Sequence, residues 1–366
     1  MEVTIRNIIQ VLENFAPPAL QTSYDNAALM CGEPHKTCSG VLCTLDITEA
    51  VIEEAVAKGC NLIVAHHPIW FTARKRLNGE DMVSRCLLMA IRKDIALYAI
   101  HTNLDHVHAG VNHKICQVLG IERPQILDPK YGILLKLVTY APLGATAEIV
   151  EALFAAGAGN IGNYDSCAFI SEGTGSYRPL PGSNPFQGAE GIREVAPEQK
   201  IEVVFPAWHK DKVMAALRSA HPYEEVAYQI FKTENAVADF GSGMIGDLSQ
   251  PVSKADFLKM VKERFHCGVI RYADSVKQQI QRVAVCGGSG SFLIPQAMRA
   301  GADALITADI TYHTFFDAES KMMLLDIGHY ESEQFTPLIL HAIMSEKFPN
   351  FALHLSGIRT NPIQYY

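Results

Sequence analysis

Apolar runs alternate with amphipathic stretches in the first third of the chain. The apolar runs cover residues 40–47, 61–68 and 95–105, and stretches with helical periodicity occupy 48–59 and a segment that ends near Arg92. A strand-helix-strand-helix-strand order is typical of a parallel sheet whose strands are joined by crossover helices. We therefore expect an α/β half in this region.

The same alternation returns after residue 280. Apolar runs lie at 282–288, 302–309 and 322–329, and helical stretches lie at 291–301, 311–320 and 331–346. This pattern reads βαβαβα and predicts a second half with a parallel sheet.

The middle of the chain has a different pattern. A strand-helix unit occurs twice between residues 131 and 240, around a Gly/Pro/Ser-rich stretch at 171–185. This pattern predicts a ferredoxin-like βαββαβ module of the α+β class. The expected fold class is thus α/β, with two parallel-sheet halves forming one domain from residues 1–130 and 241–366, interrupted by an insert at 131–240. Because an insert requires host chain ends that lie close together, residues near 130 and 240 should be neighbours.

Composition narrows the classes of protein to consider. At 366 residues, with 48% hydrophobic and 19% charged residues, the chain should fold into two or three domains. The net charge of −8 gives no basic excess for nucleic acid. Nine cysteines without a C-x-x-C pair indicate reduced thiols. We see no secretion signal and no apolar run of roughly 18 residues, and expect a cytoplasmic protein without a membrane partner.

Candidate metal ligands follow three of the predicted strands. His66 and His67 end one apolar run, Asp105 follows another, and His329 and Glu333 stand four residues apart where a helix follows a third. Ligands bind α/β sheets in the crevice at the carboxyl ends of strands. Residues at positions i and i+4 also share one helical face. These five side chains are therefore expected to meet.

Three imidazoles and two carboxylates suit Zn²⁺, Mn²⁺ or Fe²⁺. Five donors are too many for one tetrahedral ion that keeps an open position, but they suit two ions about 3.5–4 Å apart, bridged by a carboxylate and water. Glu333 is the candidate bridge. Taken singly, each residue also has an ordinary structural interpretation, such as a helix N-cap or a turn.

Weaker signals surround these ligands. His101 and His313 lie at or just beyond strand ends and are candidate catalytic residues that could donate a proton to a leaving group, although a supporting role fits equally well. Asp309 could orient a histidine. The glycine-rich run 287–290 could cradle a phosphate, but a tight βα turn is the better interpretation because the rest of a Walker or dinucleotide fingerprint is missing.

Several runs together resemble the Nif-three-like family, whose members are also named GTP cyclohydrolase I type 2 homologues. The matching runs are residues 24–32, 64–71, 101–112, 286–318 and 326–335. The resemblance implies that His66, His67, Asp105, His329 and Glu333 bind a dinuclear metal centre. The run at 221–228 is similar to a CutA/PII-like module that many bacterial members carry as an insert. Tyr24, Ala28 and Ala308 depart from the family pattern, but none of these positions is a ligand.

The resemblance implies an assembly and an activity. The assembly is a homohexamer of two paired trimers, a ring with the metal sites facing its internal cavity. The activity is hydrolysis at C8 of the guanine ring of GTP, with formate release and a metal-bridging water as nucleophile. The sequence shows no guanine pocket, so other nucleotides or cyclic amides remain open as substrates. Two further hypotheses are a metal-binding regulatory or scaffold protein without significant catalysis, and a metal storage or delivery protein.

Overall fold

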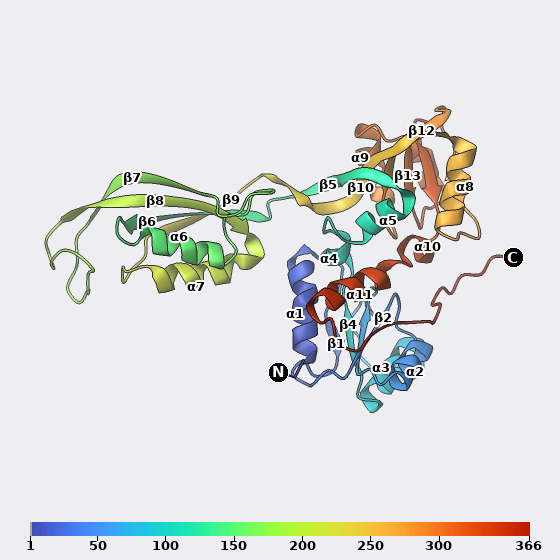
Figure 1. Ribbon diagram of the computed structural model, residues 1–366, viewed down its shortest axis with the longest axis horizontal. Helices are drawn as coiled ribbons and strands as arrows, with labels where there is room; N and C mark the ends of the chain where they lie inside the picture. Colours follow the sequence, from blue (N-terminus) through green and yellow to red (C-terminus); the bar gives the residue numbers. More distant parts are fainter. Residues whose placement is uncertain (1) are drawn as a thin grey trace. The chain divides into compact units, whose positions relative to one another are not determined.

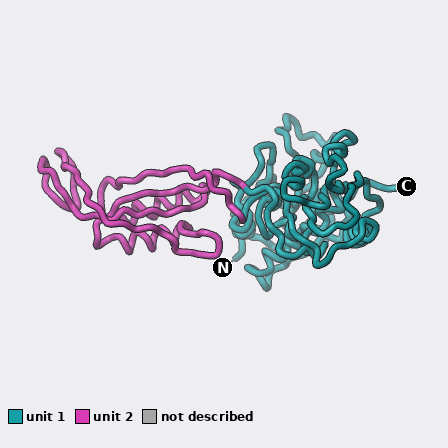
Figure 2. Tube along the Cα trace, turned by 90° about the horizontal axis from the view of Figure 1, so that it is seen from above, with its two compact units in different colours: residues 1–129, 239–366 teal, residues 130–238 magenta. Residues whose placement is uncertain are grey.

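The computed structural model describes residues 2–366, and they form two compact units (Figure 2). Unit 1 contains residues 2–129 and 239–366, and unit 2 contains residues 130–238. The chain leaves unit 1 along β5 (Ile121–Tyr131) and returns along β10 (Ala236–Ser253), and these two strands are neighbours in one sheet. A Cβ on Gly241 would collide with the backbone of Asp128 and Pro129. The expected closeness of the segments near 130 and 240 is confirmed.

The first sheet of unit 1 carries a parallel core. Its order is β1 (Leu29–Cys31), β4 (Ala96–Ala99), β3 (Leu62–Ala65), β2 (Val41–Thr44) and β15 (Leu353–Leu355). Strands β4, β3, β2 and β15 are parallel, and β1 pairs antiparallel with β4. Every residue of β2, β3 and β4 is buried, as is usual for strands covered on both faces. Helices α2 (Glu49–Ala57) and α3 (Met82–Arg92) contribute to the core on one of these faces.

The second sheet of unit 1 is mixed. Its order is β11 (Arg271–Ala273), β14 (Met323–Asp326), β13 (Ala304–Thr307), β12 (Gln279–Val285), β10 and β5. Strands β12, β13 and β14 are parallel, but β11 and β10 pair antiparallel with β14 and β12. Both predicted parallel halves are thus present as parallel cores, but each sheet also contains antiparallel strands, namely β1, β10 and β11. These strands lie outside the strand-helix-strand repeat, so the alternation carried no information about their direction.

Helices complete unit 1. They are α1 (Ile5–Phe15), α4 (Thr102–Asp105), α5 (Val111–Leu119), α8 (Lys254–Arg264), α9 (Ile294–Arg299), α10 (His329–Glu333) and α11 (Thr336–Lys347). The stretch expected as one helix at 331–346 is divided between α10 and α11, because Pro337 favours the first turn of a new helix. The stretch at 311–320 forms the 3₁₀ helix η4 (His313–Ala318).

Unit 2 has the element order βαββαβ. Its elements are β6 (Leu134–Pro142), α6 (Thr146–Ala155), β7 (Ala168–Tyr177), β8 (Glu194–Pro206), α7 (Lys210–Ala220) and β9 (Tyr228–Lys232). The sheet is antiparallel in the order β7-β8-β6-β9. Helices α6 and α7 lie together on one face of the sheet (Figure 1), where residues such as Ile201 and Leu217 form the core. Glu198 and Lys200 alternate with Ile201 and so belong to the opposite face.

The helices of residues 2–366 are short, and the nine cysteines are free thiols. None of these helices is long and apolar enough to cross a membrane. Helix α11 has 12 residues and is therefore about 18 Å long, against about 30 Å for a hydrocarbon core.

Strand β3 should be essential for the stability of unit 1. Ile63 is fully buried in β3, so Ile63→Ala should lower the free energy of unfolding by about 2–5 kcal/mol. Val56 on α2 is 44% exposed, so the control Val56→Ala should change it by about 0.5 kcal/mol or less. Chemical denaturation followed by fluorescence reports this unit alone in a Trp208→Phe background, where Trp70 is the remaining tryptophan. Equal effects of the two substitutions would contradict the assignment of Ile63 to the core.

Candidate metal centre

All five expected ligands meet within unit 1. His66 and His67 follow β3 directly, and Asp105 is the last residue of α4, shortly after β4. His329 and Glu333 are the first and last residues of α10, which follows β14. The cluster therefore gathers the carboxyl ends of strands from both sheets, which is the placement that the strand-end argument predicts.

Glu333 occupies the middle of the cluster and uses its two oxygens differently. Its Oε2 lies 3.0 Å from Nε2 of His67 and 3.1 Å from Nε2 of His329. Its Oε1 lies 3.8 Å from Nε2 of His66, which in turn lies 3.6 Å from Oδ1 of Asp105. Two groups of three side chains thus share one carboxylate, and each group could hold a metal ion. A third possible group joins His66, His67 and His101 without Glu333.

Two buried atoms in this cluster lack a hydrogen-bond partner within residues 2–366. They are Nε2 of His66 and Oδ1 of Asp105. Leaving a buried polar atom unsatisfied costs about 1–3 kcal/mol, so such atoms require an explanation. Ligands that lie about 2.1 Å from a tetrahedral ion are about 3.4 Å from each other. The 3.6 Å separation of these two atoms fits a shared cation.

The histidines are held so that Nε2 faces the centre of the cluster. Their Nδ1 atoms donate to three oxygens: the Ile100 carbonyl for His66 (2.9 Å), Asp46 for His67 (2.7 Å) and Asp309 for His329 (2.6 Å). Partners of this kind fix the ring orientation and the tautomer of a ligating histidine. The carbonyl can only accept, so Nδ1 of His66 carries the proton and Nε2 presents a lone pair.

Asp309 orients a histidine, as expected, whereas Asp46 was missed. Asp46 comes just after β2, so the strand-end argument that found Asp105 could have found it too. The hydroxyl of Thr360 donates to the second oxygen of Asp46. No sequence signal connects Thr360 with a residue more than 300 positions away.

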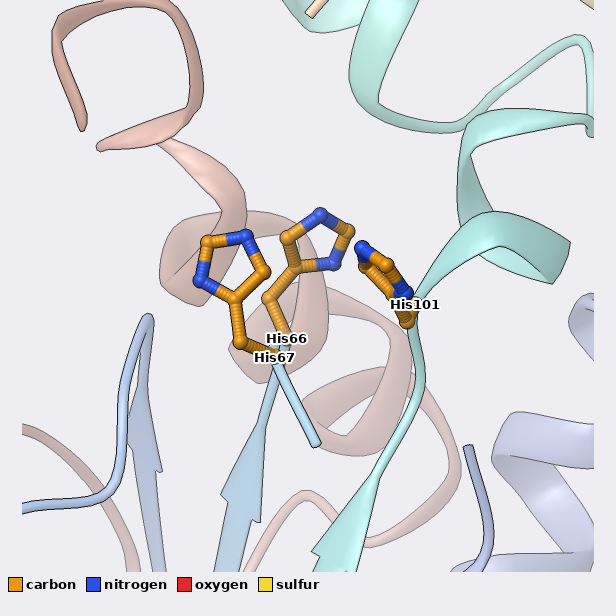
Figure 3. A group of neighbouring side chains, drawn as sticks. All are labelled: His66, His67 and His101. Atoms are coloured by element: carbon orange, nitrogen blue, oxygen red, sulfur yellow. The ribbon is translucent and has the colours of Figure 1, made fainter. Parts of the chain in front are cut away.

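His101 lies beside His66 and His67 (Figure 3). Its ring centroid is 5.2 Å from that of His66 and 5.4 Å from that of His67. Its Nδ1 donates to Oδ1 of Asp25 at 2.9 Å. Burial works against the charge of Asp25, but hydrogen bonds from His101 and Thr102 outweigh burial and hold the pKa of Asp25 well below its usual range. Asp25 stands in the run Tyr24-Asp25-Asn26 and was not singled out as a site residue.

His313 is not brought into this cluster. It is exposed in η4, where its ring contacts Tyr312 at a centroid distance of 5.2 Å, and it belongs to none of the groups of possible ligands in residues 2–366. The strand-end argument placed His313 only approximately, because the segment after β13 continues into the 3₁₀ helix η4, where His313 is exposed.

The glycine-rich run forms a tight turn in which the amides of all three glycines are occupied. The amides donate to side chains of unit 1: Gly287 to Asn112, Gly288 to Ser332 and Gly290 to Thr307. Gly288 has φ +59°, and a Cβ there would lie 2.5 Å from Oε1 of Glu333. The run therefore provides space for the Glu333 carboxylate and does not form a phosphate cradle.

Comparison with known proteins identifies the family of the chain. A family model described as Duf34/NIF3 (NGG1p interacting factor 3) matches residues 3–362. The chain belongs to the Duf34/NIF3 family. Proteins named GTP cyclohydrolase 1 type 2 homolog from Halalkalibacterium halodurans and Bacillus subtilis are each 36% identical to it, over 98% of both chains. The crystal structure of a Bacillus cereus protein related to NIF3 superposes with a TM-score of 0.88 at 34% identity, covering 100% of both chains.

In this Duf34/NIF3 site, protons on the side chains balance the negative charge of the carboxylates. Burial disfavours the charge of His67 and His329, but hydrogen bonds with carboxylates outweigh it and raise the pKa to about 10 for His67 and about 11 for His329. Burial lowers the pKa of His66 to about 4. Burial and the nearby Glu333 raise the pKa of Asp105 well above its usual range. A cation would replace these protons.

These shifts predict how stability depends on pH without metal. The unfolded chain releases the histidine protons near the ordinary pKa of 6.5, whereas the folded chain keeps them to about 10 for His67 and about 11 for His329. Stability that is fully present below pH 6.5 should therefore decline as pH rises toward these values, by at most about 1.4 kcal/mol per pH unit for His67. Denaturation between about pH 7 and 9 in chelator measures the slope. Asp46→Asn should make it shallower, and an unchanged slope would contradict this origin.

Proposed function

We propose that the chain binds two divalent metal ions in this cluster and is a metal-dependent hydrolase of the GTP cyclohydrolase type 2 kind. The observation that carries the proposal is Glu333, which presents one oxygen to His67 and His329 and the other toward His66 and Asp105. The partnerless Nε2 of His66 and Oδ1 of Asp105 support a cation in the second group. The imidazole and carboxylate donors suit Zn²⁺, Mn²⁺ or Fe²⁺.

Two bound ions would supply Lewis acidity and a coordinated water whose pKa is near neutral. Opening the imidazole ring of a guanine nucleotide adds water at C8 and breaks one bond from C8 to a ring nitrogen, which leaves an N-formyl group. A second water then hydrolyses this formyl group and releases formate, and the nitrogen that leaves in each step needs a proton. His101 is the candidate donor, because it lies next to His66 and His67 but has Asp25 on its Nδ1. Asp25 holds the ring and stabilises the imidazolium before the proton is transferred. The names of the relatives from Halalkalibacterium halodurans and Bacillus subtilis support this substrate class.

Metal content is the first test of the two-ion proposal. Elemental analysis of untagged protein should find about two ions per chain. Glu333→Ala should abolish both, because one oxygen faces each group, whereas His329→Ala should leave close to one. The double variant His66→Ala/Glu333→Ala should hold none. His313→Ala is the matched control and should keep both, because His313 is exposed outside the groups. A native stoichiometry of one, or equal loss in both single variants, would contradict a shared carboxylate.

Formate release from GTP, measured at matched metal loading, tests catalysis. His101→Gln should lower kcat by about 10²-fold or more, because it removes the proton donor. The metal content should stay native, because His101 belongs to neither of the two groups that share Glu333. Asp25→Asn should lower kcat less and shift its pH profile, because it acts through His101. His313→Gln should have no effect. Full activity in His101→Gln would contradict the role of His101.

A second candidate function is a metal-binding regulatory or scaffold protein that forms a homohexameric ring without significant catalysis. The separate unit 2 favours it, because its element order and its sheet order β7-β8-β6-β9 fit a ferredoxin-like module of the CutA/PII-like kind. Two bound ions without formate release from GTP would support this candidate against the hydrolase.

A further inference from the structure

Unit 2 contains a cavity of its own, about 610 Å³ in volume. Its floor includes Tyr140, Glu198 and Lys200, on the face of the sheet opposite α6 and α7. Its rim comes from the loop at 178–193 between β7 and β8. Cavities of about 300–1,000 Å³ are the size that small-molecule sites have.

Hydrogen bonds hold the loop over this cavity. The hydroxyl of Tyr177 donates to the carbonyl of Gln187 at 2.9 Å, and the amide of Asn184 donates to Glu224 at 2.8 Å. The amide of Gly191 donates back to the carbonyl of Pro179 at 2.8 Å. Loops of this length without secondary structure are uncommon in compact domains and are often binding loops. These hydrogen bonds therefore fix the loop as a wall of the cavity, although the loop contains no strand or helix.

Three of the four aromatic rings that line the cavity are tilted against one another. The centroids of Tyr177 and Tyr223 are 6.1 Å apart with an interplanar angle of 57°, and those of Phe186 and Tyr223 are 5.9 Å apart at 46°. Parallel rings would form a slot for a flat base, whereas tilted rings present their faces to a compact group. Aromatic faces attract cations, most strongly alkylammonium groups.

A buried carboxylate lies among these rings. Glu198 is 8% exposed, and its Oε1 accepts from the hydroxyl of Tyr223 at 2.8 Å. Burial and Glu198 raise the pKa of Tyr223, so the phenol keeps the proton that it donates. Gly175 makes room for the carboxylate, since a Cβ there would collide with Oε2 of Glu198. Within residues 2–366, the hydrogen bond to Glu198 engages Oε1, and none engages Oε2.

The charges around the cavity favour a cationic ligand. Four glutamates line it, against the two basic residues Arg178 and Lys200. Lys200 is already paired with Glu202, outside the cavity lining, so it does not offset the glutamates within it. The cavity therefore combines an acidic excess with aromatic faces.

We propose that this cavity binds a small organic cation with an alkylammonium head group, which lies against Tyr177, Phe186 and Tyr223 and is neutralised by Glu198. This proposal does not rest on the metal centre, because every residue of the cavity belongs to unit 2. Binding here would give the chain a second ligand besides the substrate of the metal centre.

Calorimetric titration of the full chain tests the charge requirement. Choline is the probe, and 3,3-dimethylbutan-1-ol is its neutral analogue of the same shape. Choline should bind saturably, and the neutral analogue should bind at least about tenfold more weakly, the difference that a desolvated cation–π contact produces. Equal binding of both compounds, or saturable binding of neither, would overturn the proposal.

Substitutions locate the site. Glu198→Gln should weaken choline binding by about tenfold or more, while Glu151→Gln, the same change at an exposed position of α6, should leave it unchanged. Phe186 is 58% exposed, so Phe186→Leu should keep the fold and still weaken binding severalfold. Thermal melting of each variant separates lost binding from lost structure. Native choline affinity in a folded Phe186→Leu or Glu198→Gln variant would overturn the proposal.

Discussion

The Glu333 carboxylate is the constraint around which unit 1 is organised. It is 3% exposed, and a buried carboxylate is costly unless several charged or polar partners surround it. The partners come from the ends of β3 and β14, and Gly288 has no side chain that would occupy the space of Oε1. Since the strands belong to different sheets, this one carboxylate also joins the two halves of unit 1. The arrangement of the halves is therefore tied to the geometry of the site.

Carboxylate oxygens on the Nδ1 side of the histidines connect the position of the site to the rest of the fold. Asp309 has φ +54°, a backbone conformation that few residues other than glycine adopt, and aspartate is among those that tolerate it. The turn directs its carboxylate to His329. On the other side, Thr360 fixes Asp46, so the segment after β15 contributes to the position of His67. Such outer partners alter metal affinity without contacting a metal.

Much of the fold and of the cluster was predictable because both depend on local patterns. His66, His67 and Asp105 follow buried parallel strands, and His329 and Glu333 share one helical face, so rules of short range place all five. The remainder depends on long-range pairing. The direction of β1 and β11, the contact of Thr360 with Asp46 and the exposure of His313 follow from tertiary structure that alternation does not encode. The cavity of unit 2 was missed for the same reason, since only strand pairing and the loop bring Gly175, Glu198 and Tyr223 together.

The four imidazoles of the centre differ in the group that faces Nε2, and this difference underlies the roles that we propose for them. Nε2 of His67 and His329 faces Glu333, and Nε2 of His66 faces Asp105, so all three are positioned as ligands. Within residues 2–366, no hydrogen bond engages Nε2 of His101, while Asp25 holds its Nδ1. An imidazole that is oriented by a carboxylate and open on its other side can exchange a proton with a substrate. The proposed division between metal binding and proton transfer thus requires no change in residue type, only different partners for the ring nitrogens.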